Sequence, residues 1–144
     1  MDIRQITPDF AAAPQIEPSE MSVLAEQGFS TVINNRPDVE IPPPLHAEQM
    51  RAAAEAVGLR YVENPADTRS MSLETVRAQL AAIDASPGPV LAYCASGTRS
   101  TILWALSMAG RMPTDEIIDA AATGGYDLAP FRGQIDGLAA TRDL

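Results

Sequence analysis

The sequence predicts a single α/β domain built on a mainly parallel sheet. Three short runs rich in Val, Ile or Tyr, at 30–35, 59–64 and 88–94, are bounded by Gly, Pro or polar residues, as buried strands are. Helical patterns separate these runs, and such alternation predicts parallel strands joined by right-handed crossovers. With 144 residues the chain has the length of one domain, so we assign 1–144 to a single unit flanked by helices.

The helices are expected between and after these strands. Each candidate combines apolar residues at helical spacing with a start or stop signal such as Ser, Pro or Gly. The candidates span 17–28, 45–58, 70–88, 100–110 and 114–125. In the third of them, Ser70 or Ser72 is the expected N-cap. The segment 3–13 is expected to add one or two strands, and 126–144 is ambiguous between helix and ordered coil.

Composition and charge restrict the possible partners. The net charge of −9 and the pI near 4.4 argue against nucleic acid and anionic membranes, because the mean field would repel both. The N-terminal segment lacks the pattern of a secretory signal, no apolar run is long enough to span a bilayer, and a single cysteine forms no internal disulfide. We therefore expect a cytoplasmic protein. His46 is the sole histidine, so we expect neither a metal set nor a cofactor, and a surface or capping role for His46.

The only cysteine, Cys94, ends the third apolar run and precedes a glycine-bearing turn. Ligands of parallel sheets collect at the carboxyl ends of strands, where the next helix presents unpaired N–H groups. Gly97 permits a left-handed residue in this turn, so the backbone can curl into an anion nest. The nest and Arg99 favour thiolate over thiol, which makes Cys94 a candidate nucleophile and not merely a small buried hydrophobe. The expected binding residues are Ala95, Ser96, Gly97, Thr98, Ser100 and Arg36.

Several of these residues have alternative interpretations. Ser100 either hydrogen-bonds the Cys94 thiolate or serves as a helix N-cap. Arg36 directly follows the strand at 30–35 and should face the same rim as Cys94, where it either binds substrate or braces the rim loop together with Asp38. Asp67 follows the strand at 59–64 and is either a general acid or a turn residue.

The residues at these positions resemble a known family. The stretches "VINNRPD" at 32–38, "GLRYVENP" at 58–65 and "GPVLAYCASGTRSTILWAL" at 88–106 are similar to the beta-lactamase-hydrolase-like protein, phosphatase-like domain family, a bacterial group within the protein-tyrosine-phosphatase superfamily that is also described as sulfur transferases. The resemblance covers about 3–110. It implies a tyrosine-phosphatase-like fold, with the cysteine loop between a central strand and a helix N-terminus.

The spacing inside the cysteine loop departs from that of tyrosine phosphatases. Those enzymes place five residues between Cys and Arg, usually with His before the Cys, whereas this chain places four between Cys94 and Arg99, with Tyr93 in front. Rhodanese-type sulfurtransferases are similar in having a six-residue loop that begins at Cys, so the spacing favours sulfur chemistry. Relatives often carry Arg where this chain has Ala95, which leaves Arg99, Arg36 and Arg69 to supply positive charge.

Three functions follow from this loop. The main prediction is sulfur transfer through a Cys94 persulfide, with a small anionic or sulfane-sulfur substrate. Domains of this family are found fused to persulfide-dioxygenase-like metalloenzymes, which suggests such an enzyme as a partner. The alternative is a tyrosine-phosphatase-like hydrolase that forms a phosphocysteine, with Arg99 on the phosphate and Asp67 as the acid. The third is a catalytically inactive domain that binds an anion or senses oxidants through Cys94.

Overall fold

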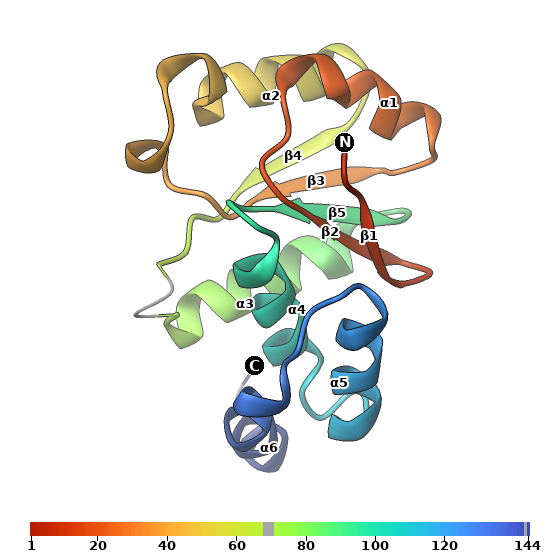
Figure 1. Ribbon diagram of the computed structural model, residues 1–144, viewed down its shortest axis with the longest axis vertical. Coiled ribbons are helices and arrows are strands. Elements are labelled where there is room, and N and C mark those ends of the chain that lie inside the picture. The colour runs from red at the N-terminus through yellow and green to blue at the C-terminus, as the bar shows by residue number, and fades with distance from the viewer. Residues whose placement is uncertain (68–70, 143) are drawn as a thin grey trace.

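A five-stranded sheet forms the centre of the computed structural model, which describes residues 1–67, 71–142 and 144 (Figure 1). The strand order is β1-β2-β5-β3-β4. β1 runs antiparallel to β2, and the other neighbours are parallel. The strands are β1 (Arg4–Thr7), β2 (Phe10–Ala13), β3 (Thr31–Asn34), β4 (Arg60–Glu63) and β5 (Val90–Tyr93). The predicted α/β class with a mainly parallel sheet is confirmed, and the segment 3–13 supplies two strands.

Helices cover both faces of this sheet (Figure 1). On one face lie α1 (Met21–Glu26) and α2 (Ala47–Ala56), and on the other lie α3 (Leu73–Ala85), α4 (Thr98–Met108), α5 (Thr114–Thr123) and α6 (Arg132–Thr141). Ser72 is the N-cap of α3, since its hydroxyl accepts from the Thr75 N–H at 3.1 Å; Ser70 lies outside the described residues. The ambiguous C-terminal stretch contains α6. Within the part of the chain that the structure describes, no helix is long and apolar enough to cross a membrane.

Two hydrophobic cores meet at β5 and thereby position the residue that follows it. Val90 and Ala92 face the core under α3 to α6, whereas Leu91 and Tyr93 face the core under α1 and α2. This alternation is the two-residue period of a strand that is buried on both faces. Because β5 lies between β2 and β3, the chain leaves the sheet at its middle, and the next residue is Cys94.

The helix after the cysteine loop is buried almost all round. Nine residues of α4, from Arg99 to Ser107, are buried. Trp104 stacks on Phe10 of β2 with ring centroids 5.8 Å apart, inside the core under α3 to α6. A helix held this firmly gives the cysteine loop a rigid C-terminal anchor.

Candidate active site

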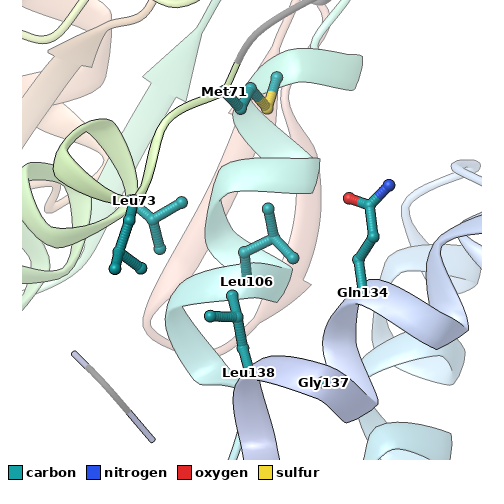
Figure 2. Close-up of a pocket in the computed structure, with 7 residues that line it drawn as sticks. Met71, Leu73, Leu106, Gln134, Gly137 and Leu138 are labelled. Atoms are coloured by element: carbon teal, nitrogen blue, oxygen red, sulfur yellow. The ribbon is translucent and has the colours of Figure 1, made fainter. Parts of the chain in front are cut away.

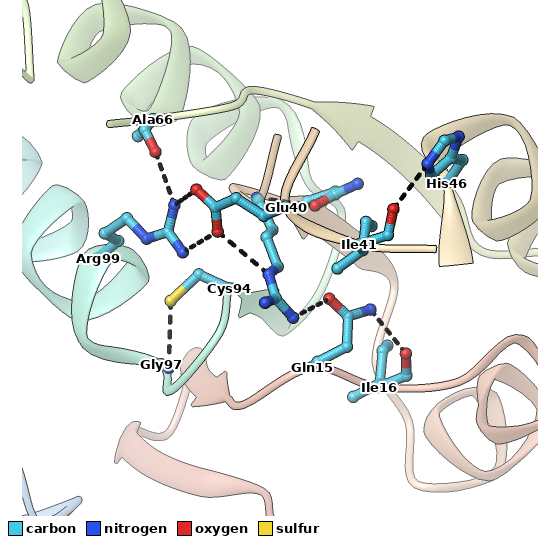
Figure 3. A network of polar contacts seen from close by, with 11 residues as sticks. Gln15, Ile16, Glu40, Ile41, His46, Ala66, Cys94, Gly97 and Arg99 are labelled. Carbon is cyan, nitrogen blue, oxygen red and sulfur yellow. Dashed lines mark hydrogen bonds and ion pairs between the residues drawn. The ribbon is translucent and has the colours of Figure 1, made fainter. Parts of the chain in front are cut away.

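Cys94 lies at the carboxyl end of β5 and at the N-terminus of α4. Its backbone N–H donates to the Ala13 carbonyl at 3.3 Å, which ties it to β2. Its side chain is almost fully buried, and Sγ accepts from the Gly97 N–H at 3.1 Å (Figure 3). The N–H groups in the first turn of a helix have no partner within the helix and carry its positive dipole end. Sγ thus lies at the N-terminal end of α4, within reach of its donors.

Residues outside the cysteine loop donate hydrogen bonds to two of its backbone carbonyls. The Ala95 carbonyl accepts from the Gln15 N–H at 3.3 Å, and the Ser96 carbonyl accepts from the Tyr126 hydroxyl at 3.0 Å. Gly97 has φ +91°, so the predicted left-handed glycine is confirmed. A Cβ at Gly97 would also lie 2.1 Å from Tyr126 Oη. With these two carbonyls bound by outside donors, the Gly97 N–H faces the sulfur, whereas the Thr98 N–H donates to Ser96 Oγ at 3.4 Å.

Arg99 is the second charged group of the site, and its guanidinium is already engaged. Nη1 and Nη2 donate to the two carboxylate oxygens of Glu40 at 2.8 and 2.7 Å, and Nη1 also donates to the Ala66 carbonyl at 3.0 Å (Figure 3). The hydrogen bonds to Glu40 raise the pKa of Arg99 against the opposing effect of burial, and the nearby Cys94 raises it further. The same bonds hold the pKa of the Glu40 carboxyl below its usual value. Sequence reasoning missed Glu40, whose one local signal is its position four residues after Arg36.

Arg36 also contacts Glu40. Its Nε donates to Glu40 Oε1 at 3.2 Å, and its Nη1 donates to Gln15 Oε1 at 3.3 Å. The predicted bracing of Arg36 by Asp38 is wrong, because the bracing carboxylate is that of Glu40. Asp38 instead accepts the Ala47 N–H at 2.8 Å at the start of α2. Thus Arg36, predicted as a rim residue, shares one carboxylate with Arg99.

His46 lies at the start of α2, away from the cysteine loop. It occupies the N-cap position by its backbone, its Nε2 is 2.9 Å from the Ile41 carbonyl, and its Nδ1 is 3.9 Å from Asp38. Across the described residues, no group of three or more His, Cys, Asp or Glu side chains could hold a metal ion.

Three amide side chains and the hydroxyl of Ser100, the residue after Arg99, form a buried uncharged cluster, called the amide cluster below. Ser100 is the third residue of α4 and not its N-cap, because that position belongs to Gly97. Its hydroxyl donates to Asn35 Oδ1 at 2.8 Å, so the hydrogen bond described for this hydroxyl goes to Asn35 and not to Cys94. Asn35 Nδ2 donates to Gln79 Oε1 at 2.8 Å, and Asn64 Nδ2 donates to the same oxygen at 2.9 Å. All four side chains are buried, and together they join β3, the loop after β4, α3 and α4.

Asp67 lies at the rim of the site. It is exposed and directly follows Ala66, whose carbonyl accepts from Arg99. The chain between β4 and α3 therefore passes beside the Arg99 guanidinium. Arg69, the third predicted source of positive charge, lies outside the described residues.

A separate apolar pocket lies on the far side of α4 (Figure 2). It has a volume of about 340 Å³. None of its lining residues belongs to the cysteine loop, and the walls come from α3, α4 and α6. The lining residues are Met71, Leu73, Val76, Leu106, Gln134, Gly137 and Leu138. No charged side chain lines this pocket.

Solved structures with this fold include phosphatase-like proteins. A phosphatase-like protein from Neisseria meningitidis is 32% identical with a TM-score of 0.82, over 95% of this chain and 98% of that one. Tk-PTP in its active form has a TM-score of 0.75 at 17% identity, over 98% of this chain and 97% of its own. TpbA from P. aeruginosa, crystallised in complex with pTyr, has a TM-score of 0.68 at 16% identity, over 97% and 89%. At these identities the last two show the shared fold alone, and the predicted tyrosine-phosphatase-like fold is confirmed.

Curated relatives carry the name beta-lactamase hydrolase-like protein. Those from Xylella fastidiosa (strain Temecula1) and Agrobacterium fabrum are each 35% identical, over 89% and 82% of this chain but only 30% and 27% of their own lengths. The chain thus spans less than a third of these relatives. The family described as beta-lactamase hydrolase-like protein, phosphatase-like domain, matches residues 2–111, a range that contains Cys94, Arg99 and Glu40. The chain belongs to this family.

Proposed function

We propose that this chain is a cysteine-dependent hydrolase of phosphate monoesters. The observation that carries the proposal is the position of Cys94 Sγ, which receives the Gly97 N–H at 3.1 Å at the N-terminus of α4, with the Arg99 guanidinium beside it. Backbone N–H groups and a guanidinium are the groups that stabilise a transferring phosphoryl group. The phosphatase-like relatives and fold neighbours support this function over the sulfur transfer predicted from the spacing.

The proposed reaction has two steps. The Cys94 thiolate attacks phosphorus, so that an S–P bond forms while the bond to the leaving oxygen breaks, and Asp67 gives its proton to that oxygen. Water then attacks the phosphocysteine, Asp67 takes a proton from the water, and inorganic phosphate and the thiolate are released. The loop N–H groups and Arg99 bind the phosphoryl oxygens throughout. Asp67 suits this role because it is exposed at the rim, next to the carbonyl that holds Arg99.

Sulfur transfer through a Cys94 persulfide is the second candidate. The observation in its favour is the four-residue spacing between Cys94 and Arg99, which makes this loop one residue shorter than that of tyrosine phosphatases. Transfer of sulfane sulfur between thiols requires no general acid, so Asp67 would be dispensable. The two reactions also leave different groups on the same sulfur atom.

Hydrolysis of an aryl phosphate separates these functions. We expect turnover by the wild-type chain and its loss in Cys94→Ser, with one phosphoryl group on the wild-type chain in intact mass spectra after an acid quench. The same measurement after treatment with thiosulfate or glutathione persulfide tests the second candidate. A stable added sulfur atom on the wild-type chain but not on Cys94→Ser, without aryl phosphate turnover, would replace hydrolysis by sulfur transfer.

The role of Asp67 has its own test. A general acid matters most when the leaving group is a poor one. Asp67→Asn should therefore slow hydrolysis of an alkyl phosphate far more than that of a nitrophenyl phosphate, by about 100-fold in the first case. Asp38→Asn, which removes a carboxylate that is bound at the start of α2, is the matched control. Equal slowing of both substrates by Asp67→Asn would leave Asp67 as a turn residue.

A further inference from the structure

Glu40 places a carboxylate where the two guanidinium groups of the site converge. Both of its oxygens accept from Arg99, at 2.7 and 2.8 Å, and Oε1 also accepts from Arg36 at 3.2 Å (Figure 3). A planar oxyanion gripped by two guanidinium groups is the arrangement in which proteins bind carboxylate and phosphate ligands. The side chain of Glu40 thus occupies the place of a ligand.

We propose that Arg36 and Arg99 form a two-guanidinium site for a dianionic oxyanion, and that Glu40 is a tethered anion that fills this site until the ligand displaces it. The inference rests on the proposed function, because the dianion it names is the phosphoryl group of a monoester. Beyond the proposed function, it assigns Arg36 as a second cation, Glu40 as an internal competitor, and a dianion as the preferred ligand.

The charges of the cluster explain why a dianion fits. Arg36, Arg99 and Glu40 together carry two positive charges and one negative charge, so one positive charge is left to face the Cys94 thiolate of the proposed function. A dianion in place of Glu40 neutralises both guanidinium groups, whereas a monoanion supplies no more charge than Glu40 already does. The preference for dianions therefore comes from Arg36 as the second cation. Glu40 lowers the apparent affinity of the site for every free anion, because a tethered carboxylate competes at an effective concentration on the order of millimolar.

The burial of Arg99 and the exposure of Glu40 determine which of these two side chains moves. The Arg99 side chain is 8% exposed and is also held by the Ala66 carbonyl, whereas the Glu40 side chain is 34% exposed. Glu40 ends a short 3-10 turn (Asp38–Glu40) in the proline-rich loop between β3 and α2, next to the almost fully exposed Val39. Glu40 can thus turn into water without uncovering a core. Withdrawal of Glu40 alone would strand a buried guanidinium, so the movement is coupled to the arrival of an anion.

Protection of Cys94 from iodoacetamide measures this binding without turnover. Inorganic phosphate should protect the wild-type thiol, and Glu40→Gln should lower the half-protecting phosphate concentration about ten-fold if Glu40 fills the site about 90% of the time. Asp38→Asn is the matched control, because it removes the same charge from the same loop and keeps an oxygen for the Ala47 N–H. We expect no more than a two-fold change in this control.

Three outcomes of this series would overturn the proposal. Weaker phosphate protection in Glu40→Gln would mean that Glu40 orients Arg99 and does not compete with the ligand. An equal gain in Asp38→Asn would mean that only the mean field had changed. Absence of phosphate protection in every variant would mean that the cluster is no oxyanion site.

The second cation is tested in the Glu40→Gln background, where the competitor is gone. At about pH 8, where inorganic phosphate is mainly a dianion, adding Arg36→Gln should weaken phosphate protection about ten-fold, the loss expected for one hydrogen bond between charged groups. Protection by dimethyl phosphate, a monoanion, should weaken much less. Equal loss for both anions would refute the preference for dianions, and no loss for phosphate would leave Arg99 as the sole cation. Because no step requires turnover, a chain that fails to hydrolyse phosphoesters would refute the proposed function while these protection data still decide this inference.

Discussion

Two polar clusters meet at the start of α4, and they differ in charge, burial and attachment. The amide cluster is uncharged and buried, and its hydrogen bonds join two strand ends to two helices. The ionic cluster, which contains Arg99, is charged, reaches the surface and depends on a proline-rich loop. The amide cluster consists of Asn35, Asn64, Gln79 and Ser100, and the ionic cluster consists of Arg36, Glu40 and Arg99.

The comparison separates what holds the site in place from what sets its charge. Water cannot replace a partner that is lost inside the amide cluster, so that cluster fixes α4 relative to β3 and thereby fixes the cysteine loop. In the ionic cluster, water can solvate the part-exposed Glu40 and a bound anion can take its place on Arg99, so that cluster can rearrange when an anion arrives. Stability should therefore depend on the first cluster and anion binding on the second.

The largest expected effect comes from Asn35→Ala. This change strands the Ser100 hydroxyl, the Gln79 side-chain amide and the Asn64 backbone carbonyl in the core, and leaving buried polar groups unpaired costs about 3 kcal/mol. Urea unfolding should show this loss, and Gln49→Ala, which truncates an exposed side chain on α2, should change the free energy of unfolding by less than about 0.5 kcal/mol. If Asn35→Ala cost no more than Glu40→Gln, the distinction between the clusters would be wrong.

The second largest effect is expected for Gly97→Ala, which changes the backbone of the cysteine loop. Gly97→Ala puts a side chain at φ +91° and within 2.1 Å of Tyr126 Oη, so it should destabilise the fold by about 2 kcal/mol and slow alkylation of Cys94. Gly137→Ala in α6 is the matched control, because a Cβ there meets no atom within 4 Å and alanine favours a helix. Equal stability of the two variants would show that the loop tolerates other backbone shapes.

The parts of the fold that sequence predicted are those with a repeating period. β3, β4 and β5 follow apolar runs, and α2, α3 and α4 follow helical spacing with a cap or glycine at one end. The cysteine loop could also be predicted from the sequence, because Cys94, Gly97 and Arg99 lie within six consecutive residues and each has a specific physical role in an anion nest. Local patterns of this kind need no knowledge of the tertiary structure.

The rest of the site depends on pairs far apart in the chain. Glu40 and Arg99 are 59 residues apart, and Asn35 and Gln79 are 44 apart, so no window of sequence contains either pair. Gln79 gave one usable signal, a polar residue on the apolar face of α3. The number of residues between Cys94 and Arg99 favoured sulfur transfer, but that number alone says nothing about how Glu40 engages the guanidinium or how Gln15 and Tyr126 hold the loop carbonyls.

A smaller effect is expected for Tyr126→Phe, which tests whether the part of the chain after the family match supports the cysteine loop. The variant keeps the ring over Gly97 but removes the donor to the Ser96 carbonyl, a bond that is partly accessible to water. We expect a loss of about 1 kcal/mol in urea unfolding and a change of a few-fold in the alkylation rate of Cys94. A loss larger than that of Gly97→Ala would mean that the hydroxyl, and not the left-handed glycine, is the main support of the loop.

The smallest effect is the pH dependence of the ionic cluster. Hydrogen bonds from Arg99 hold the pKa of Glu40 below its ordinary value of 4.5, so the pair stabilises the fold fully above pH 4.5 and loses this contribution as the pH falls through the lower pKa of the folded state. The difference in unfolding free energy between the wild-type chain and Glu40→Gln should be at most about 1 kcal/mol at neutral pH, since the Glu40 side chain is 34% exposed and screened by water. It should approach zero in acid, because the other acidic groups titrate in both proteins and cancel. A difference that stays constant from neutral to acidic pH would show that Glu40 does not pair with Arg99 in solution, and the ionic cluster would then lose its internal anion.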